Sequence, residues 1–382
     1  MNPEDFLKSA PGRLVRTHQG YWAFLANPLP PELSWPDSLV SLHSEAEREL
    51  VRLALSGRDF PHPAILARPF IRTEAVVSSR IEGTQATLED LYSFEAGQMT
   101  FLEGASDAHE VYNYVQALDY GLERIKSLPI SLRLIRELHA RLMEGVRGEV
   151  MTPGEFRRSQ NWIGPAGCTL ETATYVPPPV EEMHSALDAL EKFIHASSDL
   201  PALTRIGLIH YQFEAIHPFL DGNGRVGRLL ISLLLCHWDL LPRPLLHLSV
   251  YFERNQRDYY ERLLAVSRLG DWEGWLRFFL RGVCDQSREA AGRVQALQQV
   301  REQYRNLIAG RRSSRRLLEA VDLLIGTPIL TARGLQTGLH LADFKAAQRL
   351  VDVLAETGIL REASGRKRNR IYRAERVLAA LR

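Results

Sequence analysis

The 382-residue sequence contains little cysteine, no long apolar run and almost no net charge. Its three cysteines, Cys168, Cys236 and Cys284, stand far apart and form no Cys-x-x-Cys pair. This spacing argues against a disulfide framework or a zinc site and favours a reducing cytoplasm. The longest apolar run, 229–236, falls well short of the ~18 residues that a membrane span needs. The N-terminus also lacks the layout of a signal peptide, so we expect a soluble cytoplasmic protein with no membrane partner.

The small net charge conceals a difference between two parts of the chain. Lysine and arginine number 47 against 46 aspartates and glutamates, which gives +1. Residues 312–382 contain 14 basic and 7 acidic residues, so this segment carries +7 and the remainder −6. The sequence therefore predicts a basic C-terminal module on an acidic body.

Apolar residues recur at helical spacing and strand-like alternation is almost absent, which predicts an all-α body. The proline-rich stretch before about Pro36 predicts an extended arm. A first helix is expected near Ser44, where Ser44 and Glu47 have the spacing of a capping box. A second is expected from about residue 64 to Gly83. Further helices are expected at 107–126, 130–146, 181–196, 202–216, 224–238, 255–269 and 271–284.

Two segments depart from this helical pattern. Residues 152–179 contain many Gly, Pro and Thr and indicate a short hairpin or flap. Beyond a polar helical connector at 285–312, the order helix, helix, helix, hairpin predicts a winged helix-turn-helix over 313–382. Its recognition helix would be 342–357, and the basic turn 366–370 would be a wing that contacts phosphates or the minor groove of DNA. A solvated turn or a protein-docking wing explains the same residues equally well.

The segment 216–230, IHPFLDGNGRVGRLL, is the strongest candidate site, a loop between two expected helices. The triplet 222–224, Gly-Asn-Gly, allows tight turns that point backbone N–H groups inward at a helix start, which is a site for anions. Arg225 and Arg228 lie one turn apart on that helix and can bind phosphate oxygens.

Two further side chains complete the chemistry of this segment. Asp221 is an oxygen ligand suited to a Mg²⁺ ion that bridges two phosphates. His217 has the ordinary pKa range of a general base at neutral pH. A base, a metal ligand, an anion site and two arginines are the components needed for group transfer from a nucleoside triphosphate.

Other interpretations of these residues remain open at this point. The string Asp-Gly-Asn-Gly is also typical of a hairpin turn. Gly222-x-Gly224-x-x-Gly227 matches the dinucleotide fingerprint, which requires a preceding strand and βαβ alternation. His210 and His217 form a weak candidate for a metal pair.

HPFLDGNGRVGR resembles the signature of Fic proteins, His-Pro-Phe-x-Asp/Glu-Gly-Asn-Gly-Arg-x-x-Arg, at every defined position. Upstream, Ser78-Ser79-Arg80-Ile81-Glu82-Gly83 resembles the inhibitory motif of that family, Ser/Thr-x-x-x-Glu-Gly/Asn. The resemblance covers about 40–284, and a winged-helix tail recurs in such bacterial proteins. It implies an N-terminal region with an inhibitory helix, a helical Fic core with a small β-hairpin flap, a connector and a winged helix. The corresponding segments are 1–106 with the helix at about 64–83, 107–284, 285–312 and 313–382.

The resemblance implies transfer of AMP from ATP, with Mg²⁺, to a Ser, Thr or Tyr hydroxyl of a target protein or of the chain itself. His217 would take the hydroxyl proton and Asp221 would hold Mg²⁺. Asn223 and the backbone at Gly222 and Gly224 would form the anion hole. The outer phosphates would be bound by Arg225 and Arg228.

The resemblance also implies roles for residues outside the motif. The flap 154–165 would align the backbone of the target as an added strand, with Ile163 and Gly164 near the nucleotide. Tyr259 would line the adenine pocket, while Ser267 stands where some relatives have Asn. Phe219 would anchor the loop.

Glu82 has two interpretations. Ser78 and Glu82 share one helix face, so this carboxylate can pair with Arg228 and take the place of the γ-phosphate. From the residues alone Glu82 is an ordinary glutamate at a helix end beside Gly83; with the resemblance we expect it to be inhibitory. The alternatives are a de-AMPylase in which Glu82 aligns a water, or a transcription regulator that acts through the winged helix. A homodimer is an open expectation.

Overall fold

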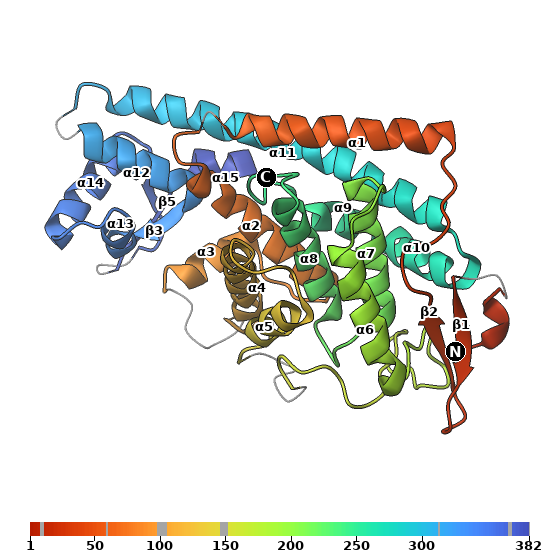
Figure 1. Cartoon of the computed structure of the whole chain (residues 1–382). Helices are drawn as coiled ribbons and strands as arrows, with labels where there is room; N and C mark the ends of the chain where they lie inside the picture. The colour runs from red at the N-terminus through yellow and green to blue at the C-terminus, as the bar shows by residue number, and fades with distance from the viewer. Residues whose placement is uncertain are drawn as a thin grey trace.

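The structure is a computed structural model that describes residues 1–7, 11–58, 60–97, 105–145, 152–311, 314–365 and 369–381. It is mostly helical, which confirms the expected all-α body (Figure 1). The helices of the body are α1 (Asp37–Ser56), α2 (Pro63–Ile81), α3 (Leu88–Glu95), α4 (Ala105–Arg124), α5 (Leu132–Leu142), α6 (Val180–His195), α7 (Ala202–Ile216), α8 (Asn223–His237), α9 (Leu248–Arg254), α10 (Gln256–Leu269) and α11 (Trp272–Ile308). None of the helices in the described ranges is long and apolar enough to cross a bilayer.

The first 36 residues are more ordered than the predicted arm. They contain a short 3₁₀ helix, Pro3–Asp5, and an antiparallel hairpin of β1 (Gly12–Arg16) and β2 (Trp22–Ala26). The prediction of an extended arm or loop is therefore wrong for the hairpin. Strand β2 (WAFLA) has no alternation of polar and apolar residues, because most of it is covered by the rest of the protein. The amide of Phe24 in this strand donates to the carbonyl of Val176.

Helix α1 begins at Asp37, so the capping box predicted at Ser44 is wrong. Pro36 precedes the helix and Asp37 places a negative charge in its first turn, which replaces a side-chain cap. A capping box does exist before α3: Thr87 Oγ1 accepts from the amide of Asp90 (3.1 Å), and Asp90 Oδ2 accepts from the amide of Thr87 (2.9 Å). Helix α3 lies outside the helices that the spacing predicted.

Helix α8 is the centre of the body. Most of its residues are buried, and it contacts α2, α4, α5 and α7. Figure 1 shows α8 among these helices. This packing brings residues from distant parts of the sequence to the N-terminal end of α8, where the candidate motif lies.

Residues Trp272–Ile308 form one continuous helix of 37 residues, α11, which runs without a break through most of the predicted helical connector. Its second half buries Val294, Leu297, Val300 and Tyr304 at helical spacing. Helix α11 packs along α1, as Figure 1 shows at the top of the molecule, and it also contacts the C-terminal helices Ser314–Gly326 and Glu375–Leu381. The predicted connector thus packs against the body and against the C-terminal helices.

The C-terminal residues form a compact module of helices and a small sheet. Its elements are α12 (Ser314–Gly326), β3 (Ile329–Thr331), α13 (Ala332–Gly338), α14 (Phe344–Glu356), β4 (Arg361–Glu362), β5 (Ile371–Arg373) and α15 (Glu375–Leu381). The sheet is antiparallel with strand order β3-β5-β4. Three helices and a strand pair follow in the predicted order; the winged-helix assignment and the domain boundaries stay predictions. Residues 366–368 of the basic turn lie outside the described residues.

Candidate active site

The candidate motif forms a tight loop between α7 and α8. Its first residue, His217, ends α7 in the left-handed region (φ +49°), and Gly222 precedes α8 with φ +77°. A positive φ is uncommon for residues other than glycine. Two side chains hold His217 in this conformation, since its carbonyl accepts from Arg157 Nε (3.0 Å) and Asn161 Nδ2 (3.1 Å). The hairpin-turn and dinucleotide interpretations fail here, because helices lie on both sides of the loop.

The imidazole of His217 is placed to act as a base. Its Nδ1 donates to the carbonyl oxygen of Glu214 at 3.3 Å, which leaves Nε2 as the nitrogen with a lone pair. Burial lowers the pKa of His217 to about 4, against the smaller opposing effect of the Glu214 carbonyl. The ring is therefore neutral at physiological pH.

The side chain of Asn223 fixes the shape of the loop. Its Oδ1 accepts from the amide of Phe219 and its Nδ2 donates to the carbonyl of Phe219, both at 2.8 Å. Phe219 is fully buried and stacks on His139 with ring centroids 3.8 Å apart. His139 Nδ1 accepts from the amide of Gly154, so Nε2 donates to the carbonyl of Asp221 (3.0 Å). The loop backbone is thus held on both sides of its turn.

The start of α8 is an anion site that a carboxylate already covers. The first amides of an α-helix have no intrahelical acceptor and carry the positive end of the helix dipole. A Cβ placed on Gly224 would lie 2.3 Å from Glu82 Oε1 and 2.8 Å from Arg228 Nη1. Gly224 therefore leaves just enough room for the Glu82 carboxylate to lie against this helix start.

Arg228 and Glu82 form a close pair. Arg228 Nη2 donates to Glu82 Oε1 at 2.6 Å and to the carbonyl of Ser78 at 2.9 Å, and its Nε donates to Ser78 Oγ at 2.9 Å. Burial alone would lower the pKa of Arg228, but the Glu82 charge outweighs it and the pKa is raised. Burial likewise opposes ionisation of Glu82, yet Arg228 holds the Glu82 pKa below its usual value. Both groups are therefore charged.

Arg225 is paired on a different side. Its Nη1 lies 3.4 Å from Glu110 Oε2 on α4, and its Nη2 lies 3.6 Å from Asp221 Oδ1. Asp221 Oδ1 also accepts from the amide of Gly222 at 2.6 Å, while the side chain remains 48% exposed. One exposed carboxylate beside an anion site suits Mg²⁺, which prefers few carboxylates together with phosphate oxygens. No group of three or more His, Cys, Asp or Glu in the described ranges could hold a metal with protein ligands alone, so Asp221 would hold the ion jointly with phosphate.

Comparison with known families matches two consecutive parts of the chain. The Fic/DOC family N-terminal description matches residues 40–123, and the Fic/DOC family description matches residues 129–235, which include the motif loop. The chain belongs to the Fic/DOC family.

Curated relatives and solved structures agree with this membership. Relatives named protein adenylyltransferase Fic from Drosophila yakuba and Drosophila virilis are 30% and 31% identical over 202 residues, which are 52% of this chain. The chain spans only 37% and 38% of the length of these relatives. A Fic family protein from Desulfovibrio desulfuricans G20 superposes with a TM-score of 0.58 at 21% identity over 91% of this chain and 98% of that one. Fic-1 from C. elegans gives 0.52 at 22% identity over 69% and 74% of the two chains. These structures show a shared fold.

The predicted flap of this Fic protein is a single β-bridge. Ile163 pairs with Tyr175, with the amide of Ile163 2.9 Å from the Tyr175 carbonyl oxygen. Tyr175 Oη donates to the carbonyl of Ala215 on α7 (2.9 Å), which ties the bridge to the helix that ends at the motif. A Cβ on Gly164 would lie 2.7 Å from Cys168 Sγ, so this position has no room for a side chain.

Tyr259, the expected adenine contact, lies beside Arg228 of the motif, and its role stays a prediction. Tyr259 is buried in an aromatic cluster, and its Oη lies 2.7 Å from His210 Nε2. His210 therefore pairs with Tyr259 and not with His217, against the metal-pair interpretation. Ser267 is buried with its Oγ 2.9 Å from Tyr211 Oη. The neighbouring Tyr260 is 46% exposed; burial and then the Glu82 charge raise its pKa, so Tyr260 lies near the Glu82 carboxylate.

Several residues that support the site were missed by sequence reasoning. Four of them hold the loop or its arginine: His139, Arg157, Asn161 and Glu110. Arg157 and Asn161 lie in the flap segment, where the sequence shows polar residues but not which ones are buried. Arg157 is 1% exposed, and burial lowers its pKa to about 10. Only its depth in the protein distinguishes it from the exposed Arg158.

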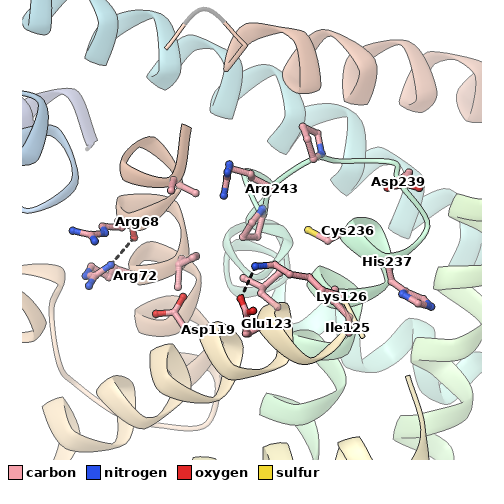
Figure 2. A pocket seen from close by; sticks show the side chains of 16 residues that line it. Arg68, Arg72, Asp119, Glu123, Ile125, Lys126, Cys236, His237, Asp239 and Arg243 are labelled. Atoms are coloured by element: carbon pink, nitrogen blue, oxygen red, sulfur yellow. Dashed lines mark hydrogen bonds and ion pairs between the residues drawn. The ribbon is translucent and has the colours of Figure 1, made fainter. Parts of the chain in front are cut away.

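A cavity of about 720 Å³ lies at the C-terminal end of α8, and none of the residues that line it belongs to the motif (Figure 2). Figure 2 shows Arg68 and Arg243 facing it, and Lys126 bonded to Glu123 across its floor. Arg72 is likewise bound to Glu95. Because positive and negative groups line it in similar numbers, this cavity offers no phosphate site comparable with the start of α8.

Proposed function

We propose that this Fic protein transfers AMP from ATP to the hydroxyl of a serine, threonine or tyrosine of a target protein. The observation that carries the proposal is the neutral imidazole of His217 beside the anion site at the start of α8. The names of the curated relatives support the choice of AMP as the transferred group.

In the proposed step the target hydroxyl oxygen forms a bond to the α-phosphorus of ATP. His217 Nε2 accepts the hydroxyl proton, and the bond from the α-phosphorus to the bridging oxygen breaks to release pyrophosphate. Mg²⁺, held by Asp221 and phosphate oxygens, supplies charge neutralisation on the leaving group. The amides at Gly222 to Gly224 and the guanidinium of Arg228 bind the phosphates, while Arg225 keeps Asp221 in place.

The flap supplies the site for the target. Trp162 and Ile163 are 42% and 37% exposed beside the motif loop. An extended segment of the target that adds to the bridge at Ile163 would receive main-chain hydrogen bonds, which position the backbone without reading its side chains. The nucleotide lies between this flap and α8, with Tyr260 near its outer end.

In this proposal the Glu82 carboxylate inhibits the enzyme. It lies against Gly224 and takes the hydrogen bond from Arg228 that the γ-phosphate requires. ATP therefore binds productively only after Glu82 moves away. Glu82 caps the C-terminal end of α2 and is followed by Gly83 in a left-handed conformation (φ +102°). Its movement therefore involves the end of α2 and not the whole helix.

The test uses ATP carrying label on either its α- or its γ-phosphate, with Mg²⁺ and cell lysate. The variant Glu82→Gly is included beside the natural protein, so that inhibition does not conceal activity. AMP transfer labels protein from α-labelled ATP only, and mass spectrometry locates the modified hydroxyl. Labelling from γ-labelled ATP would indicate phosphoryl transfer instead. If neither substrate labels protein while AMP is released from an AMP-modified target, the site is a de-AMPylase in which Glu82 aligns a water.

A further inference from the structure

The C-terminal module has an excess of positive charge that its own structure does not neutralise. Every carboxylate within 314–381 already has a hydrogen-bond or ion-pair partner: Glu319, Asp322, Asp343, Asp352, Glu356, Glu362 and Glu375. By contrast, four exposed cations have no ion pair with a carboxylate of the described ranges: Arg333, Lys345, Arg349 and Arg361.

Three of these cations lie on two consecutive helices. Arg333 is in the first turn of α13, and Lys345 and Arg349 are one turn apart on α14. In Figure 1, α14 lies at the outer end of the module, away from the Fic core. Its main packing partners are α12 and α13, so the opposite face of α14 is open. Phe344, 44% exposed, and Gln348 lie on this open part.

A groove follows α14 toward the sheet. It has a volume of about 430 Å³ and is bordered by Arg333, Phe344 and Gln348 on the helices and by Arg370 and Tyr372 at the base of β5. A second hollow of about 430 Å³ runs along α13 and also includes Arg333 and Phe344. Arg333 and Phe344 border both hollows, so the exposed first turn of α14 protrudes beside a basic depression.

We propose that this face binds duplex DNA, with α14 in the major groove and Arg333, Lys345 and Arg349 on the phosphates. An α-helix with its side chains is about 10–12 Å wide, which fits a major groove about 12 Å wide. Arg333, at the border of both hollows, contacts a phosphate beside α14. Gln348 is a side-chain type that bonds to base edges in that groove. The acidic body repels the same phosphates, which restricts DNA to this end of the molecule.

An acidic polypeptide is the competing partner, since it also carries negative charge. A flexible peptide would fill the hollows and needs no protruding helix beside them. The arrangement of one exposed helix and flanking cations favours the duplex. The proposal is independent of AMP transfer and needs neither ATP nor Mg²⁺.

The test measures fluorescence anisotropy of a labelled mixed-sequence DNA duplex of about 30 base pairs with the full chain, in EDTA, from about 50 to 200 mM salt. Three phosphate contacts predict a slope of log K against log salt near −2.7, or a loss of about 40-fold over this range. Arg333→Ala with Arg349→Ala should bring the slope to about −0.9, so that the salt-dependent loss falls by about tenfold. The matched control is Arg315→Ala with Arg316→Ala, which removes the same charge from arginines that Glu319 already binds.

The expected result is a changed slope for the first double variant and an unchanged slope for the control. Equal effects of both doubles would refute the assigned face, because net charge alone would then explain binding. Absence of duplex binding at the lowest salt would overturn the proposal. So would labelled polyglutamate that binds more tightly than DNA and depends on Arg333 and Arg349. Arg333→Gln with Arg349→Gln repeats the test with longer side chains if the alanine double fails to fold by circular dichroism.

Discussion

Arg225 and Arg228 lie one turn apart on α8, but their surroundings differ. The carboxylate that meets Arg225 comes from Glu110 on α4 and is 7% exposed, so both partners of this pair are buried. The carboxylate that meets Arg228 comes from Glu82 at the end of α2 and is 32% exposed, although the arginine itself is 1% exposed. Arg228 also keeps two hydrogen bonds to Ser78.

The difference separates a permanent contact from a replaceable one. Glu110 is buried against Arg225, so its departure would leave this buried guanidinium with Asp221, at 3.6 Å, as its carboxylate contact. Glu82 can leave, because a phosphate from solvent offers Arg228 the same charge-assisted hydrogen bond. In the proposed function, the Arg225 region shapes the loop and its Asp221, whereas the Arg228 region controls access to it.

The largest expected effect comes from the base that both regions serve. His217→Ala should lower AMP transfer by roughly 10²–10⁴-fold, because the proton is removed only in the transition state. Nucleotide affinity should remain, since His217 holds no phosphate in the ground state. Initial rates with labelled ATP and calorimetric nucleotide titration measure the two quantities. Transfer at a near-normal rate would remove His217 from the proposed step.

The next effect tests whether the Arg225 pair is permanent. Glu110→Ala should lower the free energy of unfolding by about 3–5 kcal/mol, because it removes the buried partner of Arg225 and leaves the exposed Asp221, 3.6 Å away, as the carboxylate contact. Glu82→Ala, the matched control, should cost about 1 kcal/mol, since Arg228 keeps its bonds to Ser78. Urea denaturation of both variants gives the comparison. Equal losses would show that the two pairs contribute alike and that Glu82 is no more replaceable than Glu110.

A smaller effect, an increase in activity, tests whether a phosphate can replace Glu82 as the partner of Arg228. Glu82→Gly should raise automodification and target labelling by about tenfold, the equivalent of freeing one charge-assisted bond. Arg228→Ala removes the phosphate ligand as well and should leave transfer weak. The double variant should behave as Arg228→Ala alone, because the two residues share one contact. Additive effects, or a fall in labelling by Glu82→Gly, would contradict inhibition.

A further effect concerns pH and separates the ion pairs from the buried histidines. The Glu82 pKa is lowered, so its pair with Arg228 persists above the ordinary range of a carboxyl and is lost only as pH falls below it. Burial lowers the pKa of four histidines to about 3 or 4: His139, His210, His217 and His247. Burial also raises the pKa of Glu74 and Glu214 to about 7.

From pH 7 to pH 5 the unfolded chain would gain protons on these four histidines, whereas the folded protein gains them on the two glutamates. The unfolded state thus takes up about two more protons, worth about 1.4 kcal/mol each per pH unit, and stability falls as pH falls. We expect a melting temperature several degrees lower at pH 5 than at pH 7. A melting temperature that rises toward pH 5 would show that the two glutamates dominate.

The motif could be predicted from the sequence because its chemistry is local. Gly222 supplies the left-handed turn, and Arg225 and Arg228 follow at the spacing of one helical turn. The helices from 107 onward were also largely predicted, because their apolar spacing is strong. The β1–β2 hairpin was not, because β2 has no alternation. The second half of α11 was predicted as a polar helical connector, because its many polar residues hide the buried stripe.

The supporting residues of the site could not be predicted in the same way. His139 and Arg157 become parts of the loop only because α5 and the flap pack against it. Their hydrogen bonds to the carbonyls of Asp221 and His217 join segments about 60 to 80 positions apart. No spacing rule connects residues at that distance.

The sequence by itself determined which groups the motif loop can offer: a histidine, a carboxylate, glycines at a helix start and two arginines one helical turn apart. Only the tertiary structure decided which carboxylate each arginine meets. Glu82 reaches Arg228 across 146 positions because α2 packs against the start of α8. Backbone preferences act between neighbours in the chain, whereas the partner of a buried charge is chosen by helix packing, which brings distant segments together.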